Sequence, residues 1–219
     1  MHQKEDFILR TWPFLLVTFM YVIVGMTLNK YYGEEALHIV LNKFNFPIAD
    51  FFFKYFTKTG ELIFGLFILV FIVWKSSWRM LITFISAALL QSFIIVSSKR
   101  LFFVDHHRPG FYFKEKAIDI HLVDGIKQGI TFTFPSGHTA TAFFLFLILT
   151  LLVKNNWLKF FFGIAAIFAA LSRIYLSQHF MQDTVAGGLI GILSVIFSYY
   201  FWLNKNLPFL NGQVRKIKS

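Results

Sequence analysis

The residue pair best suited to covalent chemistry is His179 and Asp183, which stand four positions apart. If a helix begins near residue 180, both side chains lie on one face of its first turn. A carboxylate that binds one imidazole nitrogen fixes the tautomer and leaves the other nitrogen basic and nucleophilic. Taken alone, the pair also fits an acidic helix start beside an interfacial histidine.

The tetrapeptide Pro135-Ser136-Gly137-His138 precedes an apolar run and is a second candidate. Ser136 can cap a helix, and Pro135 stops a helix upstream. Free N–H groups and the positive dipole end at such a helix start favour a phosphate, and Gly137 lets it come close to the backbone. His138 would stand in the first turn, where it can pass a proton. On its own, the segment is explained as well by a simple helix cap.

Cationic residues flank both motifs. Arg108, Arg173 and one member of the Lys99-Arg100 pair suit a clamp on the oxygens of a phosphoryl group in transit. One arginine at the end of a membrane span would be ordinary snorkelling. Three cationic groups, two histidines and an aspartate at one depth are costly near lipid, so their convergence predicts a shared function.

The elements that must position these residues are strongly apolar. The 219-residue chain is 57% hydrophobic and 20% aromatic, with a mean hydropathy of +0.63, which is more apolar than a soluble domain of this length. Six runs are long enough, or nearly so, to cross a bilayer. The predicted spans are 13–29, 60–75, 79–97, 138–153, 158–176 and 184–203. The first lacks an Ala-x-Ala-like cleavage site, so we expect a retained anchor rather than a signal peptide.

The remaining segments complete the predicted architecture. Residues 36–56 mix apolar and charged residues and predict a broken amphipathic helix at the membrane interface. Gly187 and Gly191 are spaced like a helix-packing seam. We therefore expect an all-α polytopic membrane protein, with six transmembrane helices and an interfacial helical segment between the first two, forming a single domain over residues 1–219.

Charge distribution predicts the orientation. The formal net charge is +10, but the charges lie between apolar runs, which favours a membrane and an anionic ligand over nucleic acid. Basic residues near the short loops and the chain ends predict that this side is cytoplasmic; they are Lys75, Arg79, Lys154, Lys159, Lys205, Arg215, Lys216 and Lys218. The motifs would then face the exterior or periplasm, and we expect a bacterial inner-membrane protein.

A metal centre is not predicted. The absence of cysteine excludes disulfides and thiolate ligands. His106, His107 and His121 add imidazoles on the same side, but no HExxH-like spacing occurs and no second carboxylate stands near Asp183. We expect no metal and no other cofactor.

Together, the motifs resemble those of the type 2 phosphatidic acid phosphatase superfamily, which includes vanadium haloperoxidases and acid phosphatases. That family has a Lys, then Arg-Pro, then Pro-Ser-Gly-His, then Ser-Arg, five residues, His, three residues and Asp. The chain matches at 108–109, at 135–138, and at 172–183 in residue type and spacing. It departs at the first Lys. The family usually leaves six residues before Arg-Pro, whereas Lys99 leaves eight, Arg100 leaves seven, and Leu101 takes the usual place.

The resemblance implies a metal-independent lipid phosphatase that works through a phosphohistidine. It implies that His179 attacks phosphorus, that Asp183 orients it, and that His138 protonates the leaving oxygen. The phosphate-binding groups would be Lys99 or Arg100, Arg108, Arg173, and the backbone amides of Ser136 and Gly137. Similar bacterial proteins act on undecaprenyl pyrophosphate, phosphatidylglycerol phosphate, phosphatidate or lipid A, and the sequence does not separate these. A phosphotransferase with the same histidine chemistry, or a non-enzymatic transporter, would be the alternatives.

Overall fold

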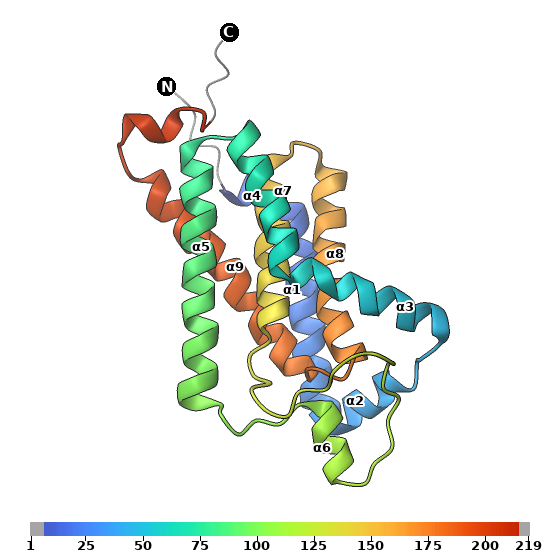
Figure 1. The fold of residues 1–219 in the computed structure, drawn as a ribbon. Helices are drawn as coiled ribbons and strands as arrows, with labels where there is room; N and C mark the ends of the chain where they lie inside the picture. Colours follow the sequence, from blue (N-terminus) through green and yellow to red (C-terminus); the bar gives the residue numbers. More distant parts are fainter. Residues whose placement is uncertain (1–6, 215–219) are drawn as a thin grey trace.

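The computed structural model describes residues 7–214, where the regular elements are helices apart from one isolated β-bridge, and a long irregular segment covers residues 116–136. Figure 1 shows a bundle of long, roughly aligned helices with shorter helices at one end. In chain order the elements are α1 (Phe7–Tyr32), α2 (Glu34–Asn42), α3 (Pro47–Phe56), the 3₁₀ turn η1 (Thr57–Gly60), α4 (Leu62–Lys75), α5 (Trp78–Ser97), the π-helical turn η2 (Ser98–Phe102), α6 (Pro109–Glu115), α7 (Gly137–Leu152), α8 (Asn156–Tyr175), α9 (Met181–Leu203) and η3 (Pro208–Asn211).

Every predicted span coincides with a helix, but not every helix is long enough to cross a membrane. Four are long and apolar enough: α1, α5 continued by η2, α8 and α9. The segment Pro47–Gly60 and α4 would make a fifth span if counted together, although they are bent by 52° where they meet. At 16 residues, α7 is shorter than the others. The chain is therefore an all-helical integral membrane protein, and the count of six spans stays a prediction.

The helix starts follow from local capping. Ser136 accepts a hydrogen bond from the Thr139 N–H at the start of α7, and Asn155 accepts from the Trp157 and Leu158 N–H groups at the start of α8. Such side chains satisfy N–H groups that have no partner inside the helix. Pro47 opens α3, where a missing N–H costs nothing.

The 16-residue helix α7 lies at the centre of the bundle and packs against α1, α5, α8 and α9. Eleven of its 16 residues are buried, so neighbouring helices rather than lipid cover most of its surface. A Cβ atom added to Gly187 or Gly191 of α9 would lie 2.3 Å from a backbone carbonyl oxygen of Ser136 or Ala140. Only glycine allows the two helices to approach so closely, and this contact brings α9 against the start of α7. The packing seam predicted at Gly187 and Gly191 is therefore confirmed.

The two ends of the bundle differ. Arg10 donates to the Leu151 carbonyl at 2.8 Å, and the Val214 N–H donates to the Ser76 carbonyl at 3.1 Å. The short α4–α5 and α7–α8 links and both ends of the described chain therefore lie together, as predicted. Three of the predicted basic residues, Arg215, Lys216 and Lys218, are outside the described residues.

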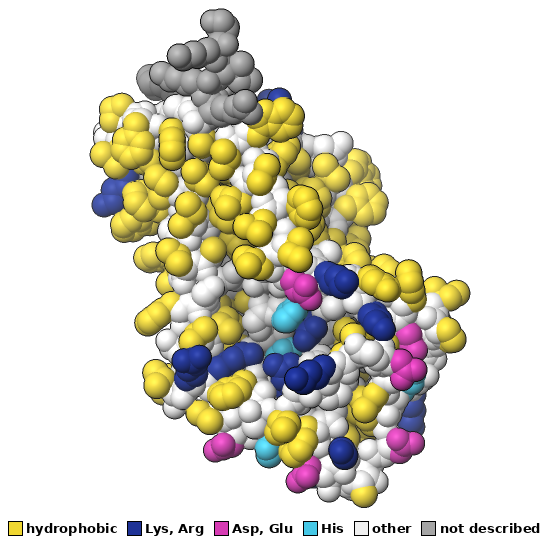
Figure 2. Space-filling view, in the orientation of Figure 1, with side chains coloured by type: hydrophobic (Ala, Val, Ile, Leu, Met, Phe, Trp, Pro, Cys, Tyr) yellow, Lys and Arg dark blue, Asp and Glu magenta, His cyan; other side chains and the backbone are white. Residues whose placement is uncertain are grey.

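At the opposite end lie α2, α3, α6 and the long segment that leads to α7 (Figure 1). The predicted interfacial segment is divided between α2 and α3, and α3 crosses α8 at a steep angle. Figure 2 shows apolar side chains over most of the upper surface and charged side chains gathered around a hollow below it.

Candidate active site

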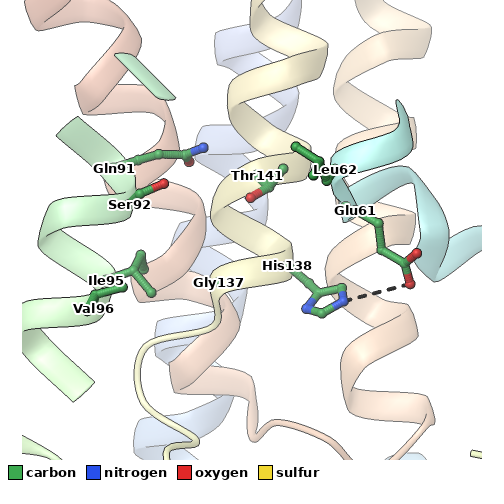
Figure 3. Close-up of a pocket in the computed structure, with 10 residues that line it drawn as sticks. Glu61, Leu62, Gln91, Ser92, Ile95, Val96, Gly137, His138 and Thr141 are labelled. Atoms are coloured by element: carbon green, nitrogen blue, oxygen red, sulfur yellow. Dashed lines mark ion pairs between the residues drawn. The ribbon is translucent and has the colours of Figure 1, made fainter. Parts of the chain in front are cut away.

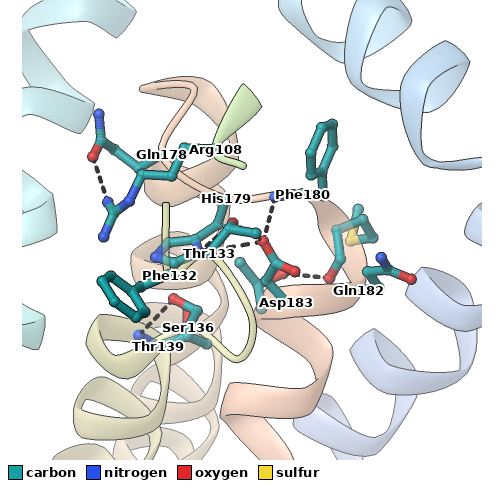
Figure 4. A network of polar contacts seen from close by, with 12 residues as sticks. Arg108, Phe132, Thr133, Ser136, Thr139, Gln178, His179, Phe180, Gln182 and Asp183 are labelled. Carbon is teal, nitrogen blue, oxygen red and sulfur yellow. Dashed lines mark hydrogen bonds and ion pairs between the residues drawn. The ribbon is translucent and has the colours of Figure 1, made fainter. Parts of the chain in front are cut away.

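The central pair of the candidate site is His179, in the turn between α8 and α9, and Asp183 of α9. His179 Nδ1 lies 3.3 Å from Asp183 Oδ2, and each side chain is only 1% exposed (Figure 4). Asp183 stands in the first turn of α9 and accepts from the Phe180 N–H at 2.9 Å, which holds its carboxylate in place. Because Nδ1 faces the carboxylate, the other ring nitrogen, Nε2, is the one left for a reacting atom.

A third residue completes this pair. The Thr133 hydroxyl lies 3.2 Å from His179 Nδ1 and donates to Asp183 Oδ2. Among the described residues, the second Asp183 oxygen, Oδ1, is buried without a hydrogen-bond partner. All three side chains are almost fully buried, so the orientation of the imidazole is fixed by its neighbours rather than by water.

The electrostatic surroundings of His179 favour its neutral form. Burial, followed by the positive charges of Arg173, Arg108 and Lys99, holds the pKa of His179 well below its usual value. The lone pair on its free nitrogen is therefore available at neutral pH.

Arg173 projects from the last turn of α8 into the site. Its Nη1 donates to the Thr57 hydroxyl at 2.7 Å, while its Nε is buried with no partner among the described residues. An unpaired buried N–H is costly, so this group is suited to an oxyanion. Thr57 belongs to η1, which brings the α3–α4 bend into the site.

Arg108 is held by the long segment before α7. Its Nε donates to the Thr131 carbonyl at 3.2 Å, and its Nη1 donates to Gln178 Oε1 at 2.8 Å (Figure 4). The Gln178 amide in turn donates to Gln128 at 2.6 Å, which ties this segment to the α8–α9 turn. Burial lowers the pKa of Arg108 from its ordinary value.

The side chains of Lys99 and Arg100 lie in different surroundings. Lys99 donates to the Phe132 carbonyl at 2.8 Å, next to Thr133, whereas Arg100 is exposed and Leu101 is 71% exposed. Both basic residues belong to the π-helical turn η2, which holds more residues per turn than an α-helix. This turn fits the longer spacing between Lys99 and Arg108, and it directs Lys99 rather than Arg100 toward the site.

The start of α7 differs in one respect from expectation. The Ser136 N–H donates to the Asp183 carbonyl at 2.9 Å, and its hydroxyl accepts from Thr139 at 3.0 Å. Ser136 is completely buried. That amide already joins α7 to α9 in this structure, and its predicted contact with phosphate stays a prediction. The Gly137 N–H, the first in α7, has no acceptor inside the helix and stays available.

His138 faces a pocket between α4, α5 and α7 (Figure 3). The pocket has a volume of ≈ 340 Å³ and is lined by Gly60, Glu61, Leu62, Gln91, Ser92, Ile95, Val96, Gly137, His138 and Thr141. His138 Nε2 lies 4.0 Å from Glu61 Oε1, and both side chains are 40% exposed. Polar groups from Gln91, Ser92 and Thr141 interrupt its apolar wall.

The other histidines lie apart from this arrangement or beside it. His121 contacts Asp50 of α3 at 2.9 Å, and His106 and His107 line a second cavity, whose lining also includes Asp183. Within residues 7–214, no group of three or more His, Cys, Asp or Glu side chains is arranged to hold a metal ion.

Sequence reasoning missed four contacting residues: Thr57, Glu61, Thr133 and Gln178. A lone acidic residue directly before an apolar run was the signal available for Glu61. The two threonines carry no such signal, because nothing in their local sequence shows that the turns containing them fold back onto His179 and Arg173.

Comparison with known proteins gives a consistent set of similarities. Residues 76–207 match the PAP2 superfamily. A lipid A 4'-phosphatase of Bacteroides thetaiotaomicron is 38% identical over 72 residues. This match covers 33% of the present chain and 32% of the relative. A lipid A 4'-phosphatase of Porphyromonas gingivalis is 25% identical over 176 residues, which cover 78% of this chain and 73% of the relative.

A solved structure is also similar. The crystal structure of Aquifex aeolicus LpxE aligns with a TM-score of 0.65 and 27% sequence identity. The alignment covers 75% of this chain and 93% of that one. The helical arrangement described above is therefore shared with a solved protein over most of both chains.

Proposed function

The chain belongs to the PAP2 superfamily, and from this premise we propose that it is a phosphatase that removes a phosphate from a lipid phosphate or pyrophosphate. One observation supports this proposal most strongly. A buried histidine, His179, is oriented by Asp183 and lies among Arg173, Arg108 and Lys99. A neutral nucleophile among cations suits attack on an anionic phosphorus centre.

In the first proposed step, Nε2 of His179 attacks phosphorus, and the bond from phosphorus to the leaving oxygen breaks. His138 gives a ring proton to that oxygen, so the lipid departs as an alcohol. Asp183 stabilises the positive charge that the imidazole of His179 gains. The product is a phosphohistidine at residue 179.

Fixed donors hold the phosphoryl oxygens during this step. The unpaired Arg173 Nε, the Gly137 N–H, Arg108 and Lys99 supply them, and the start of α7 adds its positive dipole end. Ser136 supports the cradle by capping α7.

In the second step, water attacks the phosphohistidine and gives a proton to the now neutral His138. The P–N bond breaks, phosphate leaves, and both histidines return to their starting states. Apart from the attacking water, every role in these two steps is assigned to a residue of the chain, so we expect turnover to need no metal.

The pocket beside His138 supports a glycolipid phosphate as the first substrate to test. Polyprenyl chains offer no hydroxyl groups, whereas a sugar would suit Gln91, Ser92 and Thr141. Buried Oε1 of Gln91 has no partner among the described residues. The names of the two relatives described above favour a lipid A 4'-phosphate as the first of the lipid phosphates to test.

We further propose that the chain forms a single domain in a bacterial inner membrane, with the site at the outer interface. The basic short loops lie at the end of the bundle opposite the site, which supports this orientation.

A panel of lipid phosphates assayed with purified protein in EDTA tests the proposal. We expect phosphate release from lipid A 4'-phosphate, complete loss with His179→Ala, and an unchanged rate with Glu115→Gln, an exposed control. Full activity of His179→Ala would refute the proposed nucleophile. Labelled phosphate that appears in a second lipid instead of in water would establish a phosphotransferase.

A further inference from the structure

We propose that Glu61 is a positioning residue that pairs with the protonated form of His138 while it gives its proton to the departing lipid. This inference rests on the proposed function. It assigns a role to a carboxylate that comes from the bend between α3 and α4, far in sequence from the four motifs of the site.

The short turn η1 fixes Glu61 beside His138. A Cβ atom added to Gly60 would lie 2.5 Å from the His138 carbonyl oxygen, so η1 presses directly on the first turn of α7. Thr57, at the other end of η1, accepts from Arg173 at 2.7 Å. The turn is therefore anchored to the site at both ends, and the residue that follows it has a defined place.

The contact joins a carboxylate oxygen to a ring nitrogen. Glu61 Oε1 lies 4.0 Å from His138 Nε2, within ion-pair range (Figure 3). Glu61 has an extended backbone between η1 and α4, which ends the first helical segment and directs the carboxylate into the pocket. A carboxylate at the edge of membrane-spanning helices is costly and indicates a function.

The charges around His138 make such a partner necessary. Burial comes first among the effects that oppose a positive charge on His138, followed by the charges of Arg173 from α8, the His179 ring, Arg108 from the long outer segment and Lys99 from η2. Each positive charge opposes a further positive charge on the imidazole. Within residues 7–214, the carboxylate of Glu61 lies within ion-pair distance of the ring, and we expect its negative charge to offset part of this repulsion once the ring is protonated.

The chemical consequence concerns one proton. While the bond from phosphorus to the leaving oxygen breaks, the proton moves from protonated His138 to that oxygen. An alkoxide is a poor leaving group and needs this proton, whereas a nitrophenolate departs without it. The arrangement parallels the first pair: Asp183 orients the nucleophile, and Glu61 supports the acid.

The test compares two substrates with wild type, Glu61→Gln and Glu61→Asp. One substrate is a lipid alkyl phosphate and the other is p-nitrophenyl phosphate. General acid catalysis contributes on the order of 10²–10⁴-fold, and we expect Glu61→Gln to lose about tenfold or more of kcat/KM on the alkyl ester. On the aryl ester we expect a loss of less than about threefold, because no proton is needed. Glu61→Asp keeps the charge and should recover part of the loss.

Glu115→Gln makes the same change at an exposed position at the end of α6 and should leave both rates unchanged. His138→Ala should show the same substrate dependence with a larger loss. Equal losses of Glu61→Gln on both esters, or no loss on either, would overturn the role of Glu61 alone. A wild-type protein that cleaves neither ester would overturn the proposed function and this inference together.

Discussion

Replacing Thr133 by valine removes one hydroxyl group and keeps the shape of the side chain. That hydroxyl lies 3.2 Å from His179 Nδ1, donates to Asp183 Oδ2, and belongs to a side chain that is 3% exposed. No water replaces it easily at such a buried position. The change therefore tests whether the buried hydrogen bonds around Asp183 orient the nucleophile.

The expected magnitude follows from the charge of the partner. A hydrogen bond to a charged group contributes about 1.5–3 kcal/mol, and about 1.4 kcal/mol corresponds to a tenfold change in rate. We expect Thr133→Val to lower kcat by about tenfold to a hundredfold, with a smaller effect on KM, because the nucleophile is misdirected while the cations still bind phosphate.

The assay is steady-state release of phosphate from a lipid phosphate, with Thr133→Ser as the matched control. Serine keeps the hydroxyl and loses a methyl group, so its kcat should stay within about threefold of wild type. Thermal unfolding of both variants would separate catalytic loss from unfolding. If folded Thr133→Val kept its kcat within about twofold of wild type, the proposed role of the hydroxyl would be refuted.

Three further predictions concern packing, phosphate binding and pH. Gly191→Ala should lower the free energy of unfolding by about 1–3 kcal/mol, because its Cβ would lie 2.3 Å from a backbone oxygen, whereas Gly65→Ala, with 3.6 Å to its nearest neighbour, should not; thermal unfolding measures both. Arg173→Lys should weaken inhibition by vanadate about tenfold or more, since lysine has a single nitrogen, whereas Arg173 contacts Thr57 through Nη1 and leaves Nε for the anion; equal inhibition would contradict this. Burial lowers the pKa of His38 to about 4, so the unfolded chain, with a pKa of about 6.5, gains a proton first as pH falls. Through His38, the free energy of unfolding of the protein falls below about pH 6.5, and the loss reaches about 2 kcal/mol at pH 5. His38→Gln should remove this part of the acid sensitivity, which unfolding measured as a function of pH would show.

The helices could be predicted well because long apolar runs leave few alternatives in a bilayer. The span expected at 138–153 is α7 at 137–152, and the one expected at 184–203 is α9 at 181–203. The number and length of the membrane spans were harder to predict. The span expected at 60–75 begins at a bend formed by η1 and Glu61, and this bend depends on packing against α7.

The site could be predicted only in part, for a different reason. Spacing indicates which side chains approach one another, as it did for His179 and Asp183, but not which polar groups are already paired. The Ser136 amide is such a case, because the carbonyl that occupies it belongs to Asp183, distant in sequence. Thr133, in the loop before α7, donates to the side-chain carboxylate of the same residue, Asp183. Both contacts depend on the close packing of α7 on α9, which only the folded chain shows.

The most direct test of the central claim is detection of the covalent intermediate. His138→Ala protein, which should hydrolyse the intermediate slowly, would be mixed with an aryl phosphate and quenched in alkali, where phosphohistidine survives. Mass spectrometry of the digested protein should place a phosphoryl group on His179, and the double variant His138→Ala with His179→Ala should carry none. A phosphoryl group on any other residue, or turnover without any phosphorylated enzyme, would contradict the account.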